Sequence, residues 1–284
     1  MIDPLFLVKG TVSSVKFVKA YSSHVKPMLL HFNHDNEKDS AYCIYKRGDD
    51  LRQDYVVQTM FFLFNRLWKS SPLPDKPFIH QYKILPLGED SGILEFVHGC
   101  QAAGEWQWKI LLELPDRDKV NFFKSMAGSY LACWVLGIRD RHQDNMMIKD
   151  NKIFFHIDFG FIFNDAPGFD APIFSIPGDF RRNITQDEWN FFLKLCGDAF
   201  AVLHRNSGVI INACTLLMQE LPTISVAQVR KYLVKSLMVR KSEKSAKQKI
   251  REEISAGIVS TQKELKYLVH GFATKKIWTS TPQN

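Results

Sequence analysis

Several features are missing from this sequence of 284 residues. No two of its five cysteines stand in a C-x-x-C spacing, which argues against a zinc site or a disulfide framework and fits a reducing cytosol. The longest apolar stretches, MFFLF and YLACWVLGI, are far too short to span a bilayer. The N-terminus lacks the basic start and long apolar run of a signal peptide. We therefore expect a globular, cytoplasmic chain with one large domain or two lobes.

Acidic residues are scarce in one part of the chain only. Residues 221–284 hold 13 Lys and Arg against 4 Asp and Glu, whereas residues 1–97 hold 12 against 11 and residues 98–220 hold 12 against 15. A run of this kind is usually a solvated helical face. It also suits an anionic membrane surface, where each basic residue contributes about 1 kcal/mol. We do not expect nucleic acid as a partner, because no basic stripe is interleaved with stacking aromatics.

The residue pattern changes character after Val97. Before it, alternating or β-rich runs predict strands at residues 12–19, PMLLHFN, AYCIYK, HQYKILPLG and SGILEFV, and apolar spacing predicts one helix over residues 51–69. Beyond it, residues 118–136 and most of the chain after Thr185 have helical spacing. A sheet-rich front, a linker near residues 95–98 and a helical rear predict two lobes with a cleft between them, and such clefts commonly bind ligands.

Two polar clusters interrupt the helical part, GIRDRHQDN at residues 137–145 and HIDFGF at residues 156–161. If MMIK and IFFHI between them pair as a hairpin, the two clusters become neighbours. Asn145 and Asp158 then offer oxygen ligands of the kind that Mg²⁺ takes. Asp140 and His142 are candidates to accept the proton of an attacking hydroxyl. With Lys46 at the end of a front strand, these groups have the chemistry that phosphoryl transfer requires.

The order of these residues is that of protein kinases: a strand Lys, a loop with Asp and Asn, then Asp-Phe-Gly. The loop reads DRHQDN, however, where a protein kinase has H-R-D-x-x-x-x-N, and the Gly-rich phosphate loop is missing. Together with GDDLRQD at residues 48–54, the two clusters resemble the phosphatidylinositol 3- and 4-kinases and the related large protein kinases. The resemblance covers nearly the whole chain.

The resemblance implies an α+β fold of the bilobal, protein-kinase-like kind. A small antiparallel-sheet N-lobe is expected over residues 1–97, and a larger, mainly helical C-lobe with the catalytic loop, the activation loop and C-terminal helices over residues 98–284. It also implies the cofactors ATP and Mg²⁺ (or Mn²⁺).

Matched positions carry the family's site residues onto this chain. Lys46 is predicted to contact the ATP phosphates, with Ser22 and Ser23 in the phosphate loop. The backbone of Glu95 and Val97 is predicted to bind adenine, and Asp54 to lie in an inner pocket beside Tyr82. Asp140 and His142 are the predicted catalytic residues, and Asn145 and Asp158 the predicted metal ligands. In the 3-kinases a Lys often follows the phosphate-loop serines, whereas here His24 and Val25 come next and Lys26 follows them.

Other polar residues nearby are predicted to be structural. Asp49 and Asp50 are expected to cap the helix that starts near Leu51. Arg141 and His156 are interpreted as scaffold residues.

The segment after Asp-Phe-Gly bears on the substrate. Residues 161–180 contain three Asp and no Lys or Arg. Such a loop should repel a headgroup that already carries phosphates, so unphosphorylated phosphatidylinositol is the expected substrate. DFGF and YKILPLGEDSGILE resemble the 4-kinases and predict transfer to the 4-position. The alternatives are a phosphatidylinositol 3-kinase, a serine/threonine protein kinase of the related family, and a pseudokinase scaffold, although decayed kinases commonly lose one of the key residues retained here.

The C-terminal segment KELKYLVHGF places Leu265, Leu268, Val269 and Phe272 on one helical face, with Trp278 just beyond. The family's final helix touches the membrane, and an amphipathic helix with lysines and a terminal Trp suits an interface. The alternative is that this face packs on the rear lobe. We therefore expect peripheral association with an anionic membrane that contains phosphatidylinositol.

Overall fold

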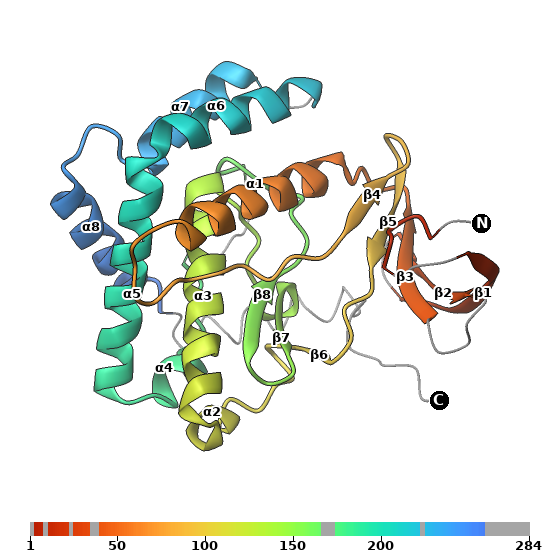
Figure 1. Ribbon diagram of the computed structural model, residues 1–284, viewed down its shortest axis with the longest axis horizontal. Coiled ribbons are helices and arrows are strands. Elements are labelled where there is room, and N and C mark those ends of the chain that lie inside the picture. Colours follow the sequence, from red (N-terminus) through yellow and green to blue (C-terminus); the bar gives the residue numbers. More distant parts are fainter. Residues whose placement is uncertain are drawn as a thin grey trace.

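The computed structural model describes residues 3–7, 11–22, 25–34, 40–165, 174–221 and 225–258. Within them the chain forms a mixed helix-and-sheet fold with two antiparallel sheets (Figure 1). One sheet has five strands in the order β1-β2-β3-β5-β4, and the other has three in the order β6-β7-β8. The strands are β1 (Val12–Ala20), β2 (Met28–His34), β3 (Ser40–Arg47), β4 (Ile84–Pro86), β5 (Ser91–Glu95), β6 (Cys100–Ala102), β7 (Met146–Lys149) and β8 (Ile153–His156).

The helices follow local signals in the sequence. The α-helices are α1 (Arg52–Lys69), α2 (Ile110–Glu113), α3 (Asp116–Leu136), α4 (Gly178–Arg182), α5 (Gln186–Arg205), α6 (Ser207–Leu217), α7 (Val226–Ser236) and α8 (Glu243–Ala256). Thr185 and Glu188 form a reciprocal capping box that begins α5. Gly137 ends α3 with φ 62°, a left-handed conformation that favours glycine.

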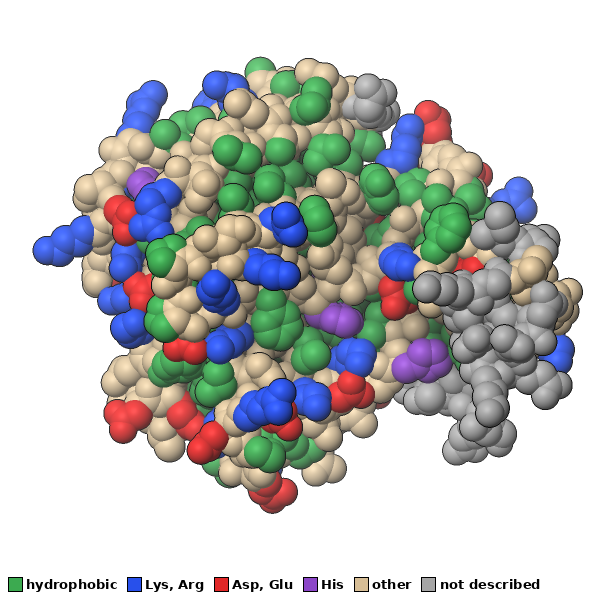
Figure 2. All heavy atoms as spheres, in the orientation of Figure 1, with side chains coloured by type: hydrophobic (Ala, Val, Ile, Leu, Met, Phe, Trp, Pro, Cys, Tyr) green, Lys and Arg blue, Asp and Glu red, His purple; other side chains and the backbone are tan. Residues whose placement is uncertain are grey.

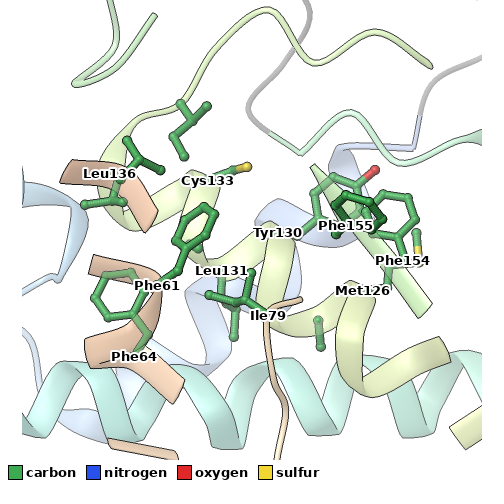
Figure 3. Close-up of a cluster of buried hydrophobic side chains, with 14 of the residues drawn as sticks. Phe61, Phe64, Ile79, Met126, Tyr130, Leu131, Cys133, Leu136, Phe154 and Phe155 are labelled. Atoms are coloured by element: carbon green, nitrogen blue, oxygen red, sulfur yellow. The ribbon is translucent and has the colours of Figure 1, made fainter. Parts of the chain in front are cut away.

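The five-stranded sheet lies at one end of the molecule, the long helices lie at the other, and the three-stranded sheet lies between them (Figure 1). One continuous apolar core joins these layers, from Leu29 and Ile44 of the large sheet to Ile250 of α8. Figure 3 shows its centre, where Phe61 and Phe64 of α1 lie near Leu131 of α3. The opposite face of the large sheet holds a smaller apolar cluster that consists of Leu5, Val12, Phe32, Cys43 and Ile93.

Most of the predicted elements are present. Each strand run identified in the sequence contains a strand, and α1 and α3 fall where helical spacing predicts them. The hairpin is confirmed, because β7 pairs with β8 from Met146↔His156 to Lys149↔Ile153. This pairing brings the ends of the two polar clusters together. Pattern reasoning missed the short elements β6, α2 and α4.

Neither aspartate occupies the N-cap position predicted for it, because the N-cap residue of α1 is Leu51, which forms no side-chain capping hydrogen bond. Asp50 Oδ1 accepts a hydrogen bond from the backbone N–H of Arg52, 3.0 Å away, at the start of α1. Asp49 forms an ion pair with Lys46 instead. The predicted C-terminal amphipathic helix, with Leu265 and Trp278, lies outside the described residues.

Candidate active site

Lys46 lies near the end of β3, opposite Gly92 of β5, and is buried with 8% of its surface exposed. Its Nζ is 2.8 Å from Asp49 Oδ2. Burial alone would lower the pKa of Lys46, but the negative charges of Asp158, Asp49 and Asp54 outweigh it, and the pKa is raised. The ammonium therefore stays charged, and it lies within electrostatic reach of Asp158 from the second polar cluster.

Asp140 and Asp158, one from each polar cluster, both have a strained backbone conformation. Asp140 has φ 60° and Asp158 has φ 62°, both in the left-handed region. This region costs an ordinary L-residue roughly 1–2 kcal/mol, and such strain gathers at functional sites. The backbone N–H of Gly160 donates to Asp158 Oδ1 at 3.3 Å, which helps to orient that carboxylate.

Arg141 ties the two clusters together. Its side chain is 1% exposed and donates to the carbonyl oxygens of Arg139 and Ile157, each at 2.8 Å, and to that of Asp158. All three acceptors are neutral backbone carbonyls, and they belong to both polar clusters. The guanidinium therefore holds the two loops in place. This geometry agrees with the interpretation of Arg141 as a scaffold residue.

Helix α1 holds the Asp-Phe-Gly turn from the other side. Gln53 Nε2 donates to the carbonyl oxygens of Phe159 at 2.7 Å and Gly160 at 2.9 Å. The backbone N–H of Phe159 donates to Asp54 Oδ1 at 3.2 Å. The Phe159 ring packs edge-on against Phe61, also on α1. Backbone groups at the turn are thus held by side chains from α1 and from the catalytic loop.

Asp54 and Tyr82, the residues predicted for an inner pocket, are both buried. Burial raises the pKa of Asp54 to about 7, with the charge of Lys46 opposing the shift and that of Asp158 adding to it. Burial also raises the pKa of Tyr82 well above its usual value, and the negative charges of Asp54 and Asp158 add to this shift. Tyr82 is thus a buried residue within electrostatic reach of Asp54 and Asp158.

The catalytic-loop residues contact one another directly. Asn145 Nδ2 donates to the Asp140 carbonyl oxygen at 3.1 Å and lies 3.2 Å from His142 Nε2. Because an amide nitrogen can only donate, His142 Nε2 is placed to accept in this contact. His142 Nδ1 faces Asp144 Oδ2 at 3.9 Å. The Asp140 carboxylate lies 3.7 Å from His142 Nε2, so the two candidate bases are direct neighbours.

The predicted metal ligands also fit their role. Because Asn145 Nδ2 is held by the Asp140 carbonyl, its Oδ1 is the atom left for a cation. The backbone N–H of Ile157 donates to the Asn145 carbonyl at 3.1 Å, which fixes Asn145 beside the strand that leads to Asp158. Within the described residues, no three His, Cys, Asp or Glu side chains gather as a metal site. One amide oxygen and one carboxylate suit Mg²⁺, which takes its other ligands from phosphates and water.

The predicted adenine-binding residues lie at the end of β5, the strand beside Lys46, and just beyond it. Glu95 ends β5 opposite Cys43, and its backbone N–H donates to the Lys83 carbonyl at 2.9 Å. Val97 is buried just beyond β5, and its backbone N–H donates no hydrogen bond to any described residue. These positions place two backbone groups on the sheet that carries Lys46; their contact with a nucleotide stays a prediction.

The phosphate-loop prediction receives the least support from the geometry. Ser22 is exposed at the turn between β1 and β2, and no hydrogen bond or ion pair joins it to the described residues of the site. Ser23 lies outside the described residues. The turn is nevertheless close to the end of β3, since a Cβ built on Gly48 would lie 4.0 Å from Val25.

Sequence reasoning missed two contributors to the site. Gln53 was part of the quoted GDDLRQD motif but received no role, because an amide on a helix gives no sign of what it contacts. Asp49 was assigned to the wrong task. In both cases the signal was the motif as a whole, in which two polar residues, Arg52 and Gln53, directly precede the buried Asp54.

Comparison with known proteins gives a consistent result. The profile of the family described as "Phosphatidylinositol 3- and 4-kinase" matches residues 41–113 and 112–226. The chain is 30% identical to "Phosphatidylinositol 3-kinase VPS34" of Arabidopsis thaliana, over 76% of this chain and 28% of that protein. The corresponding protein of Saccharomyces cerevisiae is 28% identical, over 75% of this chain and 26% of its own length. "Phosphatidylinositol 4-phosphate 3-kinase C2 domain-containing subunit beta" of Homo sapiens is 26% identical, over 97% of this chain and 18% of its own length.

These relatives bear on the predicted ring position. All three are named as 3-kinases, so the comparisons do not support the predicted 4-position and fit the 3-kinase alternative better. The 4-position was predicted from the resemblance of DFGF and YKILPLGEDSGILE to the 4-kinases, and the charge of residues 161–180 bears only on how many phosphates a headgroup already carries. The chain spans about a fifth to a quarter of the length of these relatives. With its profile match over more than half of its residues, the chain belongs to the phosphatidylinositol 3- and 4-kinase family.

Proposed function

We propose that this chain is the catalytic domain of a lipid kinase that transfers the terminal phosphate of ATP to the 3-hydroxyl of phosphatidylinositol. The observation that carries the proposal is the arrangement of Lys46 on the large sheet within electrostatic reach of Asp158, beside Asn145. A cation and two oxygen ligands in this relation suit a metal-bound triphosphate. The choice of the 3-position rests on the names of the relatives.

In this proposal the residues of the chain have separate tasks. Lys46 neutralises phosphate charge, and Asn145 and Asp158 hold Mg²⁺ or Mn²⁺, which further neutralises the phosphates when bound. Adenine binds to the backbone of Glu95 and Val97, and Ser22 and Ser23 contact the phosphates. As the hydroxyl oxygen bonds to phosphorus and the bond to ADP breaks, its proton passes to the Asp140–His142 pair.

The arrangement of lobes belongs to the same proposal. The large sheet with α1, within residues 1–97, acts as the N-lobe, and residues 98–284 act as the C-lobe that carries both polar clusters. The substrate reaches the site from an anionic membrane, with the chain as a cytoplasmic, peripherally bound protein. Among the described residues, no helix combines the length and the apolar character needed to cross a bilayer.

Incubation of the purified chain with Mg²⁺-ATP and vesicles that contain phosphatidylinositol tests the proposal. The expected product is phosphatidylinositol 3-phosphate, identified by the ring position of the new phosphate. Asp158→Asn keeps the size of the side chain but removes its charge, and should lower the rate by a factor of at least about 10³. Asp150→Asn, in the exposed β7–β8 turn, is the matched control and should retain the rate.

Three outcomes would overturn the proposal. Phosphate on the 4-hydroxyl would restore the 4-kinase interpretation. Phosphorylation of peptides but not of lipid would identify a protein kinase. Absence of ATP turnover in a folded chain would favour a scaffold.

A further inference from the structure

The described C-terminal region carries basic side chains that no acid compensates. Lys231 and Lys235 are exposed on α7, opposite its buried residues Val229 and Leu233. The turn that follows adds further exposed basic residues. Together they form what we call the α7 basic face: Arg230, Lys231, Lys235, Arg240, Lys241 and Lys244. None of these side chains forms an ion pair with a described residue.

The acids nearby are already committed elsewhere. In residues 225–258 they are Glu243, Glu252 and Glu253. Glu243 binds Arg205 of α5 at 2.9 Å, and Glu253 binds Lys249 at 2.6 Å. Glu252 accepts a hydrogen bond from Gln248. Favourable interaction with the helix dipole accounts for Lys235 in the last turn of α7 and leaves the other basic residues unexplained.

An exposed apolar residue interrupts the basic face. Val239 is 41% exposed and directly precedes Arg240 and Lys241. Figure 2 shows Lys and Arg side chains standing out from the side of the molecule where Figure 1 places α7 and α8. A surface with unpaired basic side chains and an exposed apolar residue between Lys235 and Arg240 in the chain matches the chemistry of an anionic bilayer interface.

Helix α7 lies directly against the segment that leaves the Asp-Phe-Gly turn. The ring of Tyr232 packs edge-on against Phe163 with centroids 5.9 Å apart, and its hydroxyl donates to the Trp134 carbonyl at 3.1 Å. A Cβ added to Gly137 would come within 2.6 Å of both Tyr232 and the backbone nitrogen of Asn164. Lys231 directly precedes Tyr232, so it lies on the helix that packs against Phe163, near the start of residues 161–180.

We infer that the α7 basic face is a docking surface for an anionic lipid bilayer and brings the membrane to the acceptor side of the active site. The inference rests on the proposed function for its choice of lipid over other polyanions. It also explains how residues 161–180 can lack Lys and Arg, since α7, rather than that loop, supplies the attraction to the membrane. Nucleic acid is the weaker candidate, because the face presents no row of exposed aromatic rings to stack on bases.

Binding to vesicles without substrate tests this inference apart from catalysis. The whole chain is mixed with vesicles of phosphatidylcholine alone or with phosphatidylserine, in the absence of ATP and phosphatidylinositol, and the bound fraction is measured by sedimentation. The variant carries Lys231→Gln and Lys235→Gln. The control carries Lys16→Gln and Lys69→Gln, which remove the same charge from exposed positions on β1 and α1.

Wild-type chain and control should bind the phosphatidylserine vesicles and release them as salt rises. The α7 variant should bind about 30-fold more weakly, because each basic residue contributes about 1 kcal/mol at an anionic surface. With phosphatidylinositol in such vesicles, the α7 variant should show a higher KM, whereas its rate on dispersed short-chain phosphatidylinositol should equal that of the wild type.

Equal weakening in variant and control would mean that only net charge matters and would overturn the inference. Unchanged binding of the α7 variant would do the same, as would stronger binding to single-stranded RNA than to vesicles. Because the binding assay contains no substrate, a chain that binds vesicles but transfers no phosphate would refute the proposed function alone.

Discussion

Two cationic regions of this molecule are built in opposite ways. At the Asp-Phe-Gly turn, Arg141 is buried and donates to three backbone carbonyls, and Lys46 is buried among three aspartates. On α7, Lys231 and its neighbours are exposed and have no carboxylate partner among the described residues. A buried, fully used cation fixes geometry, and its loss leaves acceptors without donors. An exposed cation contributes almost nothing to the fold but sets the field that a partner meets.

Removal of one cation from each region gives the largest expected contrast. Arg141→Met should lower the free energy of unfolding by about 3 kcal/mol or more, because it leaves three carbonyl oxygens without their donor. Lys231→Met should change it by less than about 0.5 kcal/mol. Urea unfolding followed by circular dichroism measures both. Similar losses in the two variants would show that burial of the guanidinium has no bearing on stability.

The pH dependence of stability isolates the buried carboxylate of Asp54. Its pKa is raised from 3.8 to about 7, so the folded state binds more protons than the unfolded state between these values. The contribution to stability is fully present below pH 3.8 and is lost as pH rises through about 7, with a slope of at most about 1.4 kcal/mol per pH unit. Asp54→Asn keeps the acceptor for Phe159 and should remove this slope, as measured by urea unfolding from pH 4 to 8.

Asp50 provides a control of opposite sign. Its hydrogen bonds with Arg52 lower its pKa, so its contribution is present above its unfolded pKa and is lost as pH falls. Asp50→Asn should leave the slope between pH 4 and 7 in place. A slope that persists in Asp54→Asn would assign the effect to another group.

Gln53 tests how much the α1 side of the turn matters. Gln53→Ala removes both hydrogen bonds to the turn and should lower kcat about tenfold, from a net loss of about 1–2 kcal/mol in the positioning of Asp158. The KM for ATP should change less, since Lys46 is untouched. Gln248→Ala, which removes a glutamine hydrogen bond on the surface of α8, is the matched control. An equal fall in both variants would exclude a positioning role.

The sequence predicted what depends on local pattern. The short apolar runs MMIK and IFFHI were sufficient to predict the β7–β8 hairpin, and the hairpin brings Asn145 and Asp158 into proximity. Contacts between distant segments were not predictable from pattern. Gln53 donates a hydrogen bond to the backbone of a turn 106 residues away in the chain. Asp49 forms an ion pair with Lys46 instead of capping α1, and this contact depends on where the folded sheet places Lys46. The inositol hydroxyl that accepts the phosphate was not predictable from the charge of residues 161–180.

The far end of α1 adds a mechanical consequence. Trp68 is completely buried, and its indole N–H donates to the Ala199 carbonyl of α5 at 3.0 Å. Gln53 and Trp68 are thus joined by a rigid rod roughly 22 Å long. A single helix therefore connects α5, through the Ala199 carbonyl, with the Asp-Phe-Gly turn, through the carbonyls of Phe159 and Gly160.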